Sequence, residues 1–426
     1  MSKLKLLDQA RRKVVVLDGG MGTGIQQVPL TLDDFDGLEG CNEILVATRP
    51  KVIADIHGAF FAAGCDVVET NTFGANGVVL AEYGIAHRTE ELNRIAAKLA
   101  RDVADEYSTP AQPRFVLGSV GPGTRLPSLG HISFDDLELA FRSQFAGLLA
   151  GGVDAVCIET CQDILQTKAA FFAARAAFKS AGFSVPIFLS VTIETTGAML
   201  LGSDVQTALA ALRPLKPDVL GMNCGTGPAE MIQHVSHLSR FGGEHIFTMP
   251  NAGLPVNRDG MLTYDLTPDE FADIVSRFVT EHGVGIVGGC CGTTPEHLRA
   301  LANKVESLTP RHRVAYDEPE VSSLYATVAL HQDPAPLIVG ERANANGSRK
   351  FKERLLDEDF DGMLEIAQEQ ESGGAHVLDV SVAYVDRNEG VDMNRFVPML
   401  AQSVRLPLMI DSTSPEVIEG ALKRHG

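Results

Sequence analysis

Two cysteines stand side by side, Cys290 and Cys291, within the glycine-rich stretch GIVGGCCGTTPEH. A third, Cys224, follows another short apolar run and is itself followed by glycine. Three converging thiolates suit Zn2+, which binds sulfur at about 2.3 Å. An ion with only three protein ligands keeps one open position, where a substrate thiol can bind and stay ionised. The pattern therefore indicates a catalytic zinc site.

Other interpretations of these cysteines stay open. The adjacent pair could form a strained vicinal disulfide, or all three could pack as small buried residues. Neighbouring strand residues point to opposite faces, which favours packing unless the strand ends first, as Gly288, Gly289 and Gly292 suggest. A closed, non-catalytic zinc site would need a fourth ligand, for which His297 is the nearest candidate. Packing is the predicted role of the other four cysteines: Cys41, Cys65, Cys157 and Cys161.

Eight short apolar, β-branched runs precede residue 307, and each ends in a polar or glycine-rich cluster. Such runs are typical of parallel strands buried on both faces. The segments between them are amphipathic, with predicted N-caps at Ser133, Thr267 and Thr294. Eight strand–helix units predict a (β/α)8 TIM barrel, with a doubly wound sheet as the alternative. The runs are 14–20, 65–73, 114–122, 153–163, 185–194, 217–225, 246–253 and 284–292.

The carboxyl ends of these predicted strands carry polar side chains, and barrel active sites lie at those ends. Cys224 ends the sixth strand and the adjacent cysteines end the eighth, so only one strand separates them and their side chains can converge. Other polar groups at the same rim include Asp18, Glu69, Ser119 and Glu159.

The first run ends in DGGMGTG, residues 18–24. Exposed backbone N–H groups in such a glycine-rich turn can hold a small carboxylate. The alternative is a dinucleotide loop, but the order G-x-G-x-x-G is not met and no clear helix start follows. Glu159 would then bind the ammonium group of an amino acid, the alternative being a solvated rim carboxylate.

Residues 307–336 contain several prolines and little periodicity, which predicts a linker. Strand-like runs then return at 336–342, 376–382 and 406–413, with a helix candidate at 360–374. Three parallel strands cannot close a barrel. We therefore expect 1–306 to form one barrel and 337–426 to be the truncated first part of a second (β/α)8-type barrel, within a longer protein.

Composition excludes several classes of partner. A formal net charge of −19 argues against nucleic acid and anionic membranes. There is no apolar run of about 18 residues and no secretory signal, so we expect a cytoplasmic protein.

Asp55-Ile56-His57 does not continue into the cobalamin-ligand pattern Asp-x-His-x-x-Gly, because Phe60 stands at its last position. His57 is therefore predicted to be a helix-face residue.

The motifs together resemble the homocysteine S-methyltransferase family. They are DGGMGT, ETNTFGAN, GSVGP, IET, MNCGTGP, PNAG and GGCCGTTPEH, in the expected order over most of 14–306. The resemblance implies a zinc site formed by Cys224, Cys290 and Cys291. It also implies that homocysteine binds at the Asp18–Gly19 backbone, at Glu159 and at Asn223.

The later motifs GERANANGSRKFKE, LDVSVAY and PLMIDSTSPEVIEGAL resemble the start of the pterin-binding barrel of cobalamin-dependent methionine synthases. This implies that Asn344, Asp379 and Asp411 hydrogen-bond a pterin ring.

The resemblance also implies a reaction in methionine biosynthesis. A zinc-bound homocysteine thiolate would take a methyl group from methylcobalamin, and 5-methyltetrahydrofolate would remethylate the corrinoid. Cobalamin would bind a module outside this chain, and large domain motions across the linker would let both sites reach it. The alternative is a cobalamin-independent homocysteine methyltransferase that uses betaine or S-methylmethionine.

Overall fold

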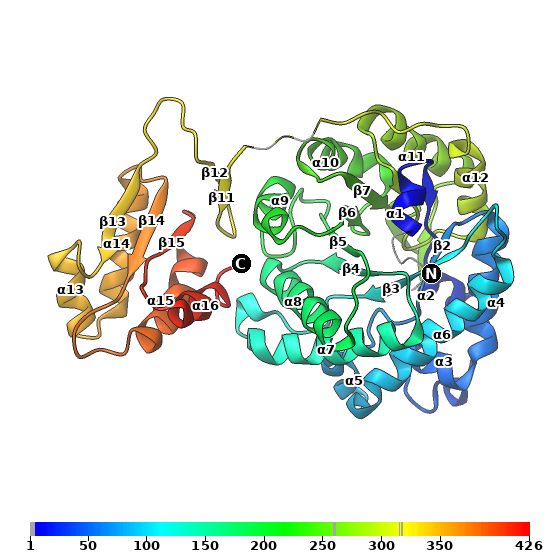
Figure 1. Ribbon diagram of the computed structural model, residues 1–426, viewed down its shortest axis with the longest axis horizontal. Coiled ribbons are helices and arrows are strands. Elements are labelled where there is room, and N and C mark those ends of the chain that lie inside the picture. The colour runs from blue at the N-terminus through cyan, green and yellow to red at the C-terminus, as the bar shows by residue number, and fades with distance from the viewer. Residues whose placement is uncertain (1–4, 259–260, 315, 317) are drawn as a thin grey trace.

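The computed structural model describes residues 5–258, 261–314, 316 and 318–426. Figure 1 shows a large unit and a smaller one, with the hairpin β11–β12 between them. None of the described helices combines the length and apolarity needed to cross a bilayer.

The large unit is a nearly closed barrel of eight parallel strands in the order β1-β10-β7-β6-β5-β4-β3-β2. The predicted TIM-type fold is thus confirmed. The strands are β1 (Val15–Val16), β2 (Val67–Glu69), β3 (Phe115–Val120), β4 (Ala155–Cys161), β5 (Ile187–Val191), β6 (Val219–Asn223), β7 (His245–Met249) and β10 (Ile286–Val287).

The seam between β1 and β2 is closed by Asp66, the residue that precedes β2. Its backbone N–H donates to the Val16 carbonyl oxygen at 2.7 Å. Its Oδ2 accepts the Val16 N–H at 3.0 Å. This side-chain carboxylate replaces the backbone carbonyl that a paired strand would offer as acceptor. Asp154 and Asp218 have the same arrangement at the start of β4 and β6.

Helices surround the barrel, as Figure 1 shows. Their apolar faces form the layer around the strands, while a separate core that includes Leu17, Phe188 and Phe247 fills the barrel interior. The helices are α4 (Pro50–Ala63), α6 (Thr89–Tyr107), α7 (Phe134–Gly151), α8 (Ile164–Ala181), α9 (Val205–Leu212), α10 (Pro228–Phe241), α11 (Pro268–His282) and α12 (Pro295–Val305).

The helices begin directly after the predicted N-caps Ser133, Thr267 and Thr294. The hydroxyls of Ser133 and Thr267 accept the N–H groups of Asp136 and Glu270. The hydroxyl of the third N-cap, Thr294, donates to the Glu296 carboxylate at 2.7 Å, and its N–H donates to His297 Nδ1 at 3.3 Å.

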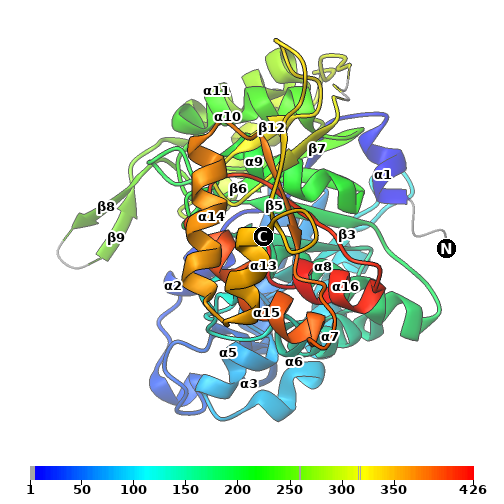
Figure 2. The same ribbon diagram turned by 90° about the vertical axis from the view of Figure 1, so that its left-hand side faces the viewer.

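Shorter helices and a hairpin decorate the barrel. The helix α1 contributes Leu6 and Leu7 to the interior core, and α2 begins directly after the glycines of the first strand, where no clear helix start was expected. The hairpin β8–β9 projects from the body in Figure 2. These elements are α1 (Lys5–Ala10), α2 (Met21–Gln26), α3 (Leu45–Thr48), α5 (Gly77–Glu82), β8 (Pro255–Arg258), β9 (Met261–Tyr264) and the 3-10 helices Leu32–Phe35, Asn42–Ile44, Ala86–Arg88, Pro127–Leu129 and Arg213–Leu215.

The segment predicted as a linker packs on the barrel. The Arg313 guanidinium donates to the carbonyls of Ser239 and Gly242, and the ring of Tyr316 lies edge-on to that of Phe241. The chain then forms the hairpin of β11 (Glu320–Ser322) and β12 (Thr327–Ala329), which the sequence did not suggest.

The smaller unit is a three-stranded parallel sheet in the order β13-β14-β15, with its own core. The helix α14 matches the predicted segment 360–374. Its elements are β13 (Val339–Asn344), α13 (Arg349–Leu356), α14 (Phe360–Ser372), β14 (Val377–Ser381), α15 (Glu389–Ser403), β15 (Leu408–Ile410) and α16 (Pro415–Leu422).

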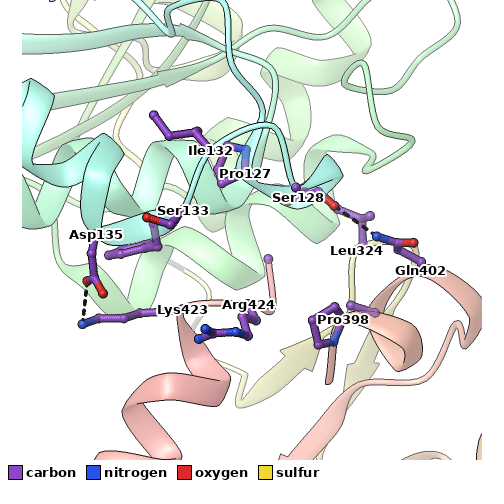
Figure 3. Close-up of a pocket in the computed structure, with 14 residues that line it drawn as sticks. Pro127, Ser128, Ile132, Ser133, Asp135, Leu324, Pro398, Gln402, Lys423 and Arg424 are labelled. Atoms are coloured by element: carbon purple, nitrogen blue, oxygen red, sulfur yellow. Dashed lines mark hydrogen bonds and ion pairs between the residues drawn. The ribbon is translucent and has the colours of Figure 1, made fainter. Parts of the chain in front are cut away.

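The two units touch around a pocket shown in Figure 3. Lys423 pairs with Asp135 at 2.8 Å. The Gln402 amide donates to the Ser128 carbonyl at 3.5 Å, and Leu324 of the hairpin lines the same pocket.

Candidate zinc and homocysteine site

The sulfur atoms of Cys224, Cys290 and Cys291 converge, all within 4.8 Å of one another. The Cys224 and Cys291 sulfurs lie 3.8 Å apart, and all three cysteines are free. Tetrahedral zinc with Zn–S bonds of about 2.3 Å holds pairs of sulfurs about 3.8 Å apart. The three cysteines therefore fit a zinc ion with one position left for another ligand.

The backbone explains how adjacent cysteines reach one point. The strand β10 ends at Val287, so both cysteines lie beyond its alternation. The Cys290 N–H donates to the Pro250 carbonyl, and the Cys291 N–H donates to the Asn251 side chain at 3.1 Å. A Cβ at Gly289 would lie 2.5 Å from the Thr293 hydroxyl, so this turn requires glycine.

Cys224 reaches the cluster by a different turn. It directly follows β6 and has a φ of 59°, a left-handed conformation that non-glycine residues rarely adopt. The chain turns there out of the strand direction, which places the sulfur over the barrel mouth. β7 lies between β6 and β10, as the predicted strand order required.

Hydrogen bonds among the three thiols distribute their charge unevenly. Hydrogen bonds from Cys224 and Cys290 lower the pKa of Cys291, whereas hydrogen bonds with Cys224 and Cys291 raise the pKa of Cys290. The hydrogen bonds therefore favour ionisation of Cys291 over Cys290.

His297 is not a fourth ligand. Its Nε2 contacts the Leu266 carbonyl at 2.9 Å and its Nδ1 contacts the Thr294 hydroxyl. Cys41, Cys65, Cys157 and Cys161 are buried, as expected of packing residues. Cys161 is the last residue of β4.

Glu159 lies at the end of β4 and is buried with a full set of neutral partners. Its Oε1 accepts from the Ser119 hydroxyl at 2.5 Å and its Oε2 from the Asn223 amide at 3.2 Å. Burial raises its pKa to about 7. It is 4% exposed, so the alternative of a solvated rim carboxylate is wrong.

Asn223 joins the carboxylate to the thiols. Its amide nitrogen lies 3.2 Å from Glu159 Oε2 and 3.8 Å from Cys290 Sγ. Its Oδ1 accepts from the Thr160 N–H and the Ser190 hydroxyl, which fixes the orientation of the amide. One side chain therefore spans the gap between the two ends of the site.

Gly19 lies in the cavity wall, directly after the buried Asp18. The Asp18 Oδ2 accepts the Glu69 N–H at 2.9 Å and its carbonyl accepts the Gly289 N–H. Gly19 and Gly20 line the cavity, and the Gly20 N–H donates to Thr293 at 3.2 Å. The glycine backbone is thus close to the cysteine loop, as a carboxylate-binding turn would need.

The cavity measures about 360 Å3 and reaches from the thiols to the carboxylates. The lining residues that were not anticipated include Tyr264 and Glu43. Tyr264 comes from β9, a hairpin that left no clear signal in the sequence, and its phenol hydrogen-bonds the Cys291 sulfur. Glu43 comes from a 3-10 helix and accepts the Gly74 N–H at 2.7 Å.

A second polar cluster lies at the strand ends of the smaller unit. The Asn344 amide donates to Asp379 Oδ2 at 2.8 Å and to Asp411 Oδ2 at 3.2 Å. Burial raises the pKa of Asp379. The three residues predicted for pterin binding therefore converge.

Both units of the chain match models of known protein families. A family model described as homocysteine S-methyltransferase matches residues 15–305, about two thirds of the chain. The chain belongs to the homocysteine S-methyltransferase family. A model described as pterin binding enzyme matches residues 340–426.

Relatives of this homocysteine S-methyltransferase chain include two methionine synthases. It is 49% identical over 422 residues to that of Mycobacterium tuberculosis, covering 99% of this chain and 35% of that protein. The Mycobacterium leprae methionine synthase is also 49% identical, over 427 residues, with the same coverage. The chain thus spans about a third of the length of these curated relatives.

Solved structures support the fold of this homocysteine S-methyltransferase chain. The homocysteine methyltransferase MmuM of Escherichia coli in its metallated form has a TM-score of 0.57 at 20% identity, covering 71% of this chain and 100% of that one. Its oxidized form has a TM-score of 0.56 at 22% identity with the same coverage. At this identity the likeness concerns the fold.

Proposed function

We propose that the large unit binds homocysteine and zinc and methylates the homocysteine sulfur to give methionine. The observation that carries this is the Asn223 amide, which lies between a three-thiol cluster and a buried carboxylate. Homocysteine carries a thiol and an ammonium group a few bonds apart, matching those two ends. Zinc supplies a Lewis acid that keeps a bound thiol ionised at neutral pH.

The chain's own residues orient the substrate. Cys224, Cys290 and Cys291 would hold the metal, and Glu159 would accept the ammonium. The Asp18–Gly19 backbone would receive the carboxylate, and Asn223 would fix the separation between the sulfur and the ammonium. Tyr264 lines the cavity beside Cys291, where it would limit the entry of water to the thiol end.

We further propose that the smaller unit binds 5-methyltetrahydrofolate. A pterin ring presents N–H donors along one edge, which suits the clustered carboxylates of Asp379 and Asp411 beside Asn344. The methyl group would pass through cobalamin held by another module of the full-length protein. We propose that the chain divides into a homocysteine-binding unit, 1–306, and the first part of a pterin-binding unit, 337–426. A linker, 307–336, joins them. The proposed compartment is the cytoplasm.

A second candidate is methylation from betaine or S-methylmethionine without cobalamin. The barrel fold shared with a homocysteine methyltransferase is compatible with it. The pterin-binding match and the convergence of its three predicted residues favour folate, because neither betaine nor S-methylmethionine contains a pterin.

The zinc assignment is tested by metal analysis and zinc-edge X-ray absorption. We expect one zinc per chain and one additional sulfur ligand when homocysteine is added. Cys290→Ala should lose zinc and homocysteine binding together, whereas Cys161→Ala, which alters a buried cysteine outside the cluster, should keep both. An unchanged sulfur count on adding homocysteine would contradict the proposed activation.

A further inference from the structure

Glu69 is a second carboxylate at the wall of the same cavity, at the end of β2. Its Oε1 atom is buried and has no hydrogen-bond partner among the described residues. Glu159 differs, because both of its oxygens already accept neutral donors. An unpaired buried carboxylate oxygen is costly and calls for a partner.

Asp18 lies beside Glu69 and also has a carboxylate oxygen without a hydrogen-bond partner among the described residues. It is 1% exposed, and its Oδ1 lacks a partner in the described part of the chain. Burial raises the pKa of Glu69, and the charges of Glu159 and Asp18 add to that effect. The described lining residues include no lysine or arginine. This end of the cavity therefore lacks a positive charge of its own.

We propose that Glu69 is a specificity-determining residue that pairs with the ammonium group of the substrate alongside Glu159, and so selects an amino-acid thiol over a thiol without an amino group. An ammonium offers three N–H donors, more than one already paired carboxylate can accept. The unpaired oxygen of Glu69 supplies a further acceptor, and an ammonium would bring the positive charge that these buried carboxyl groups lack. This inference rests on the proposed homocysteine site.

Binding of two thiols to zinc-loaded protein, measured by calorimetry, separates this role from a structural one. The ligands are homocysteine and 4-mercaptobutanoate, which is homocysteine without its amino group. Glu69→Gln should weaken homocysteine binding roughly 10- to 100-fold, as loss of a hydrogen bond to a charged group does. The affinity for 4-mercaptobutanoate should change by less than about 3-fold, since that ligand has no ammonium to pair.

Glu43→Gln is the matched control, because Glu43 lines the same cavity but has partners on both oxygens. It should affect the two thiols equally. Glu69→Asp retains the charge on a shorter side chain and should give an intermediate loss confined to homocysteine. It also serves as the test if Glu69→Gln fails to fold, which melting curves and zinc content would reveal.

Two outcomes would overturn the inference. One is unchanged homocysteine affinity in the Glu69 variants, and the other is an equal loss for both thiols. Failure of the proposed function looks different, because the unmodified zinc-loaded protein would then bind neither thiol.

Discussion

His57 is a buried histidine in α4 whose two ring nitrogens have no partner among the described residues. The helix predicted around it is confirmed. Burial lowers its pKa to about 4, because a charged imidazolium would lose its hydration. This residue therefore contributes to the dependence of stability on pH.

The direction of the pH effect follows from comparing His57 in the folded and unfolded chain. Between pH 6.5 and 4 the unfolded chain binds a proton at this position and the folded chain does not. The free energy of unfolding therefore falls as the pH falls through that window, by about 3 kcal/mol at its lower end. We predict that His57→Leu removes this contribution, so its stability relative to the unmodified protein rises as the pH falls.

Urea unfolding at several pH values between 7 and 4 measures this difference. His331→Leu, at an exposed position, is the control and should give a difference that is constant with pH. A constant difference for His57→Leu as well would show that the imidazole is already solvated or paired.

The three clustered cysteines show how far single residues can be assigned from sequence. Their chemistry and their places at strand ends predicted convergence, which the sulfur positions confirm. The unpaired oxygen of Glu69 was not predictable in this way. Whether a carboxylate is satisfied depends on which donors reach it across the barrel, and sequence order does not record that.

At the scale of elements, the seam between β1 and β2 is the weak point of the barrel. Those two strands share no ladder, and the contacts made by Asp66 close the gap. The Asp66 carboxylate also pairs with Lys13 at 2.7 Å. Without the Asp66 carboxylate, the buried Val16 N–H would lose its acceptor.

We predict that Asp66→Ala lowers the free energy of unfolding by about 2–4 kcal/mol, through an unpaired N–H and a lost ion pair. Asp154→Ala is the matched control, because Asp154 makes the same backbone contact beside an intact β3–β4 ladder. Urea unfolding should show the smaller loss for Asp154→Ala. An equal or larger loss there would mean that the seam is not held chiefly by Asp66.

Strands and helices were predictable because their patterns are local. Seven of the eight barrel strands fall within the predicted runs, and the eighth, β7, begins one residue before its run, at His245. The hairpins β8–β9 and β11–β12 were missed, since their exposed or half-buried residues carry no strong alternation. Contacts to both units, rather than local preference, hold β11–β12.

At the scale of the whole molecule, the hairpin β11–β12 connects the two units. The buried Ser323 hydroxyl donates to the Arg405 carbonyl at 2.6 Å, and Ser203 of the barrel donates to the Leu324 carbonyl at 2.6 Å. The Tyr325 hydroxyl contacts the Gln402 carbonyl at 3.4 Å. Domain motions across residues 307–336 stay a prediction, and these contacts are the ones that such motions would break.

We predict that Ser323→Ala loosens the contact between the units, because the hydroxyl also accepts the N–H groups of Tyr325 and Ala326. Limited proteolysis within 307–336 should become faster by roughly 3- to 10-fold, reflecting the loss of one buried hydrogen bond. Ser180→Ala, on the exposed end of α8, should leave the rate unchanged. Equal rates for all three proteins would argue that the hairpin does not hold the units together.

The sequence by itself determined the class of chemistry and the order of the elements, because thiols, glycines and apolar runs act locally and keep their spacing. The side-by-side cysteines are the clearest case, since their residue types already indicated zinc. The tertiary structure decided how they converge, through the left-handed turn at Cys224 and the end of β10 at Val287. It also decided which carboxylates lack partners, because hydrogen bonding inside a barrel depends on strands that are far apart in the chain.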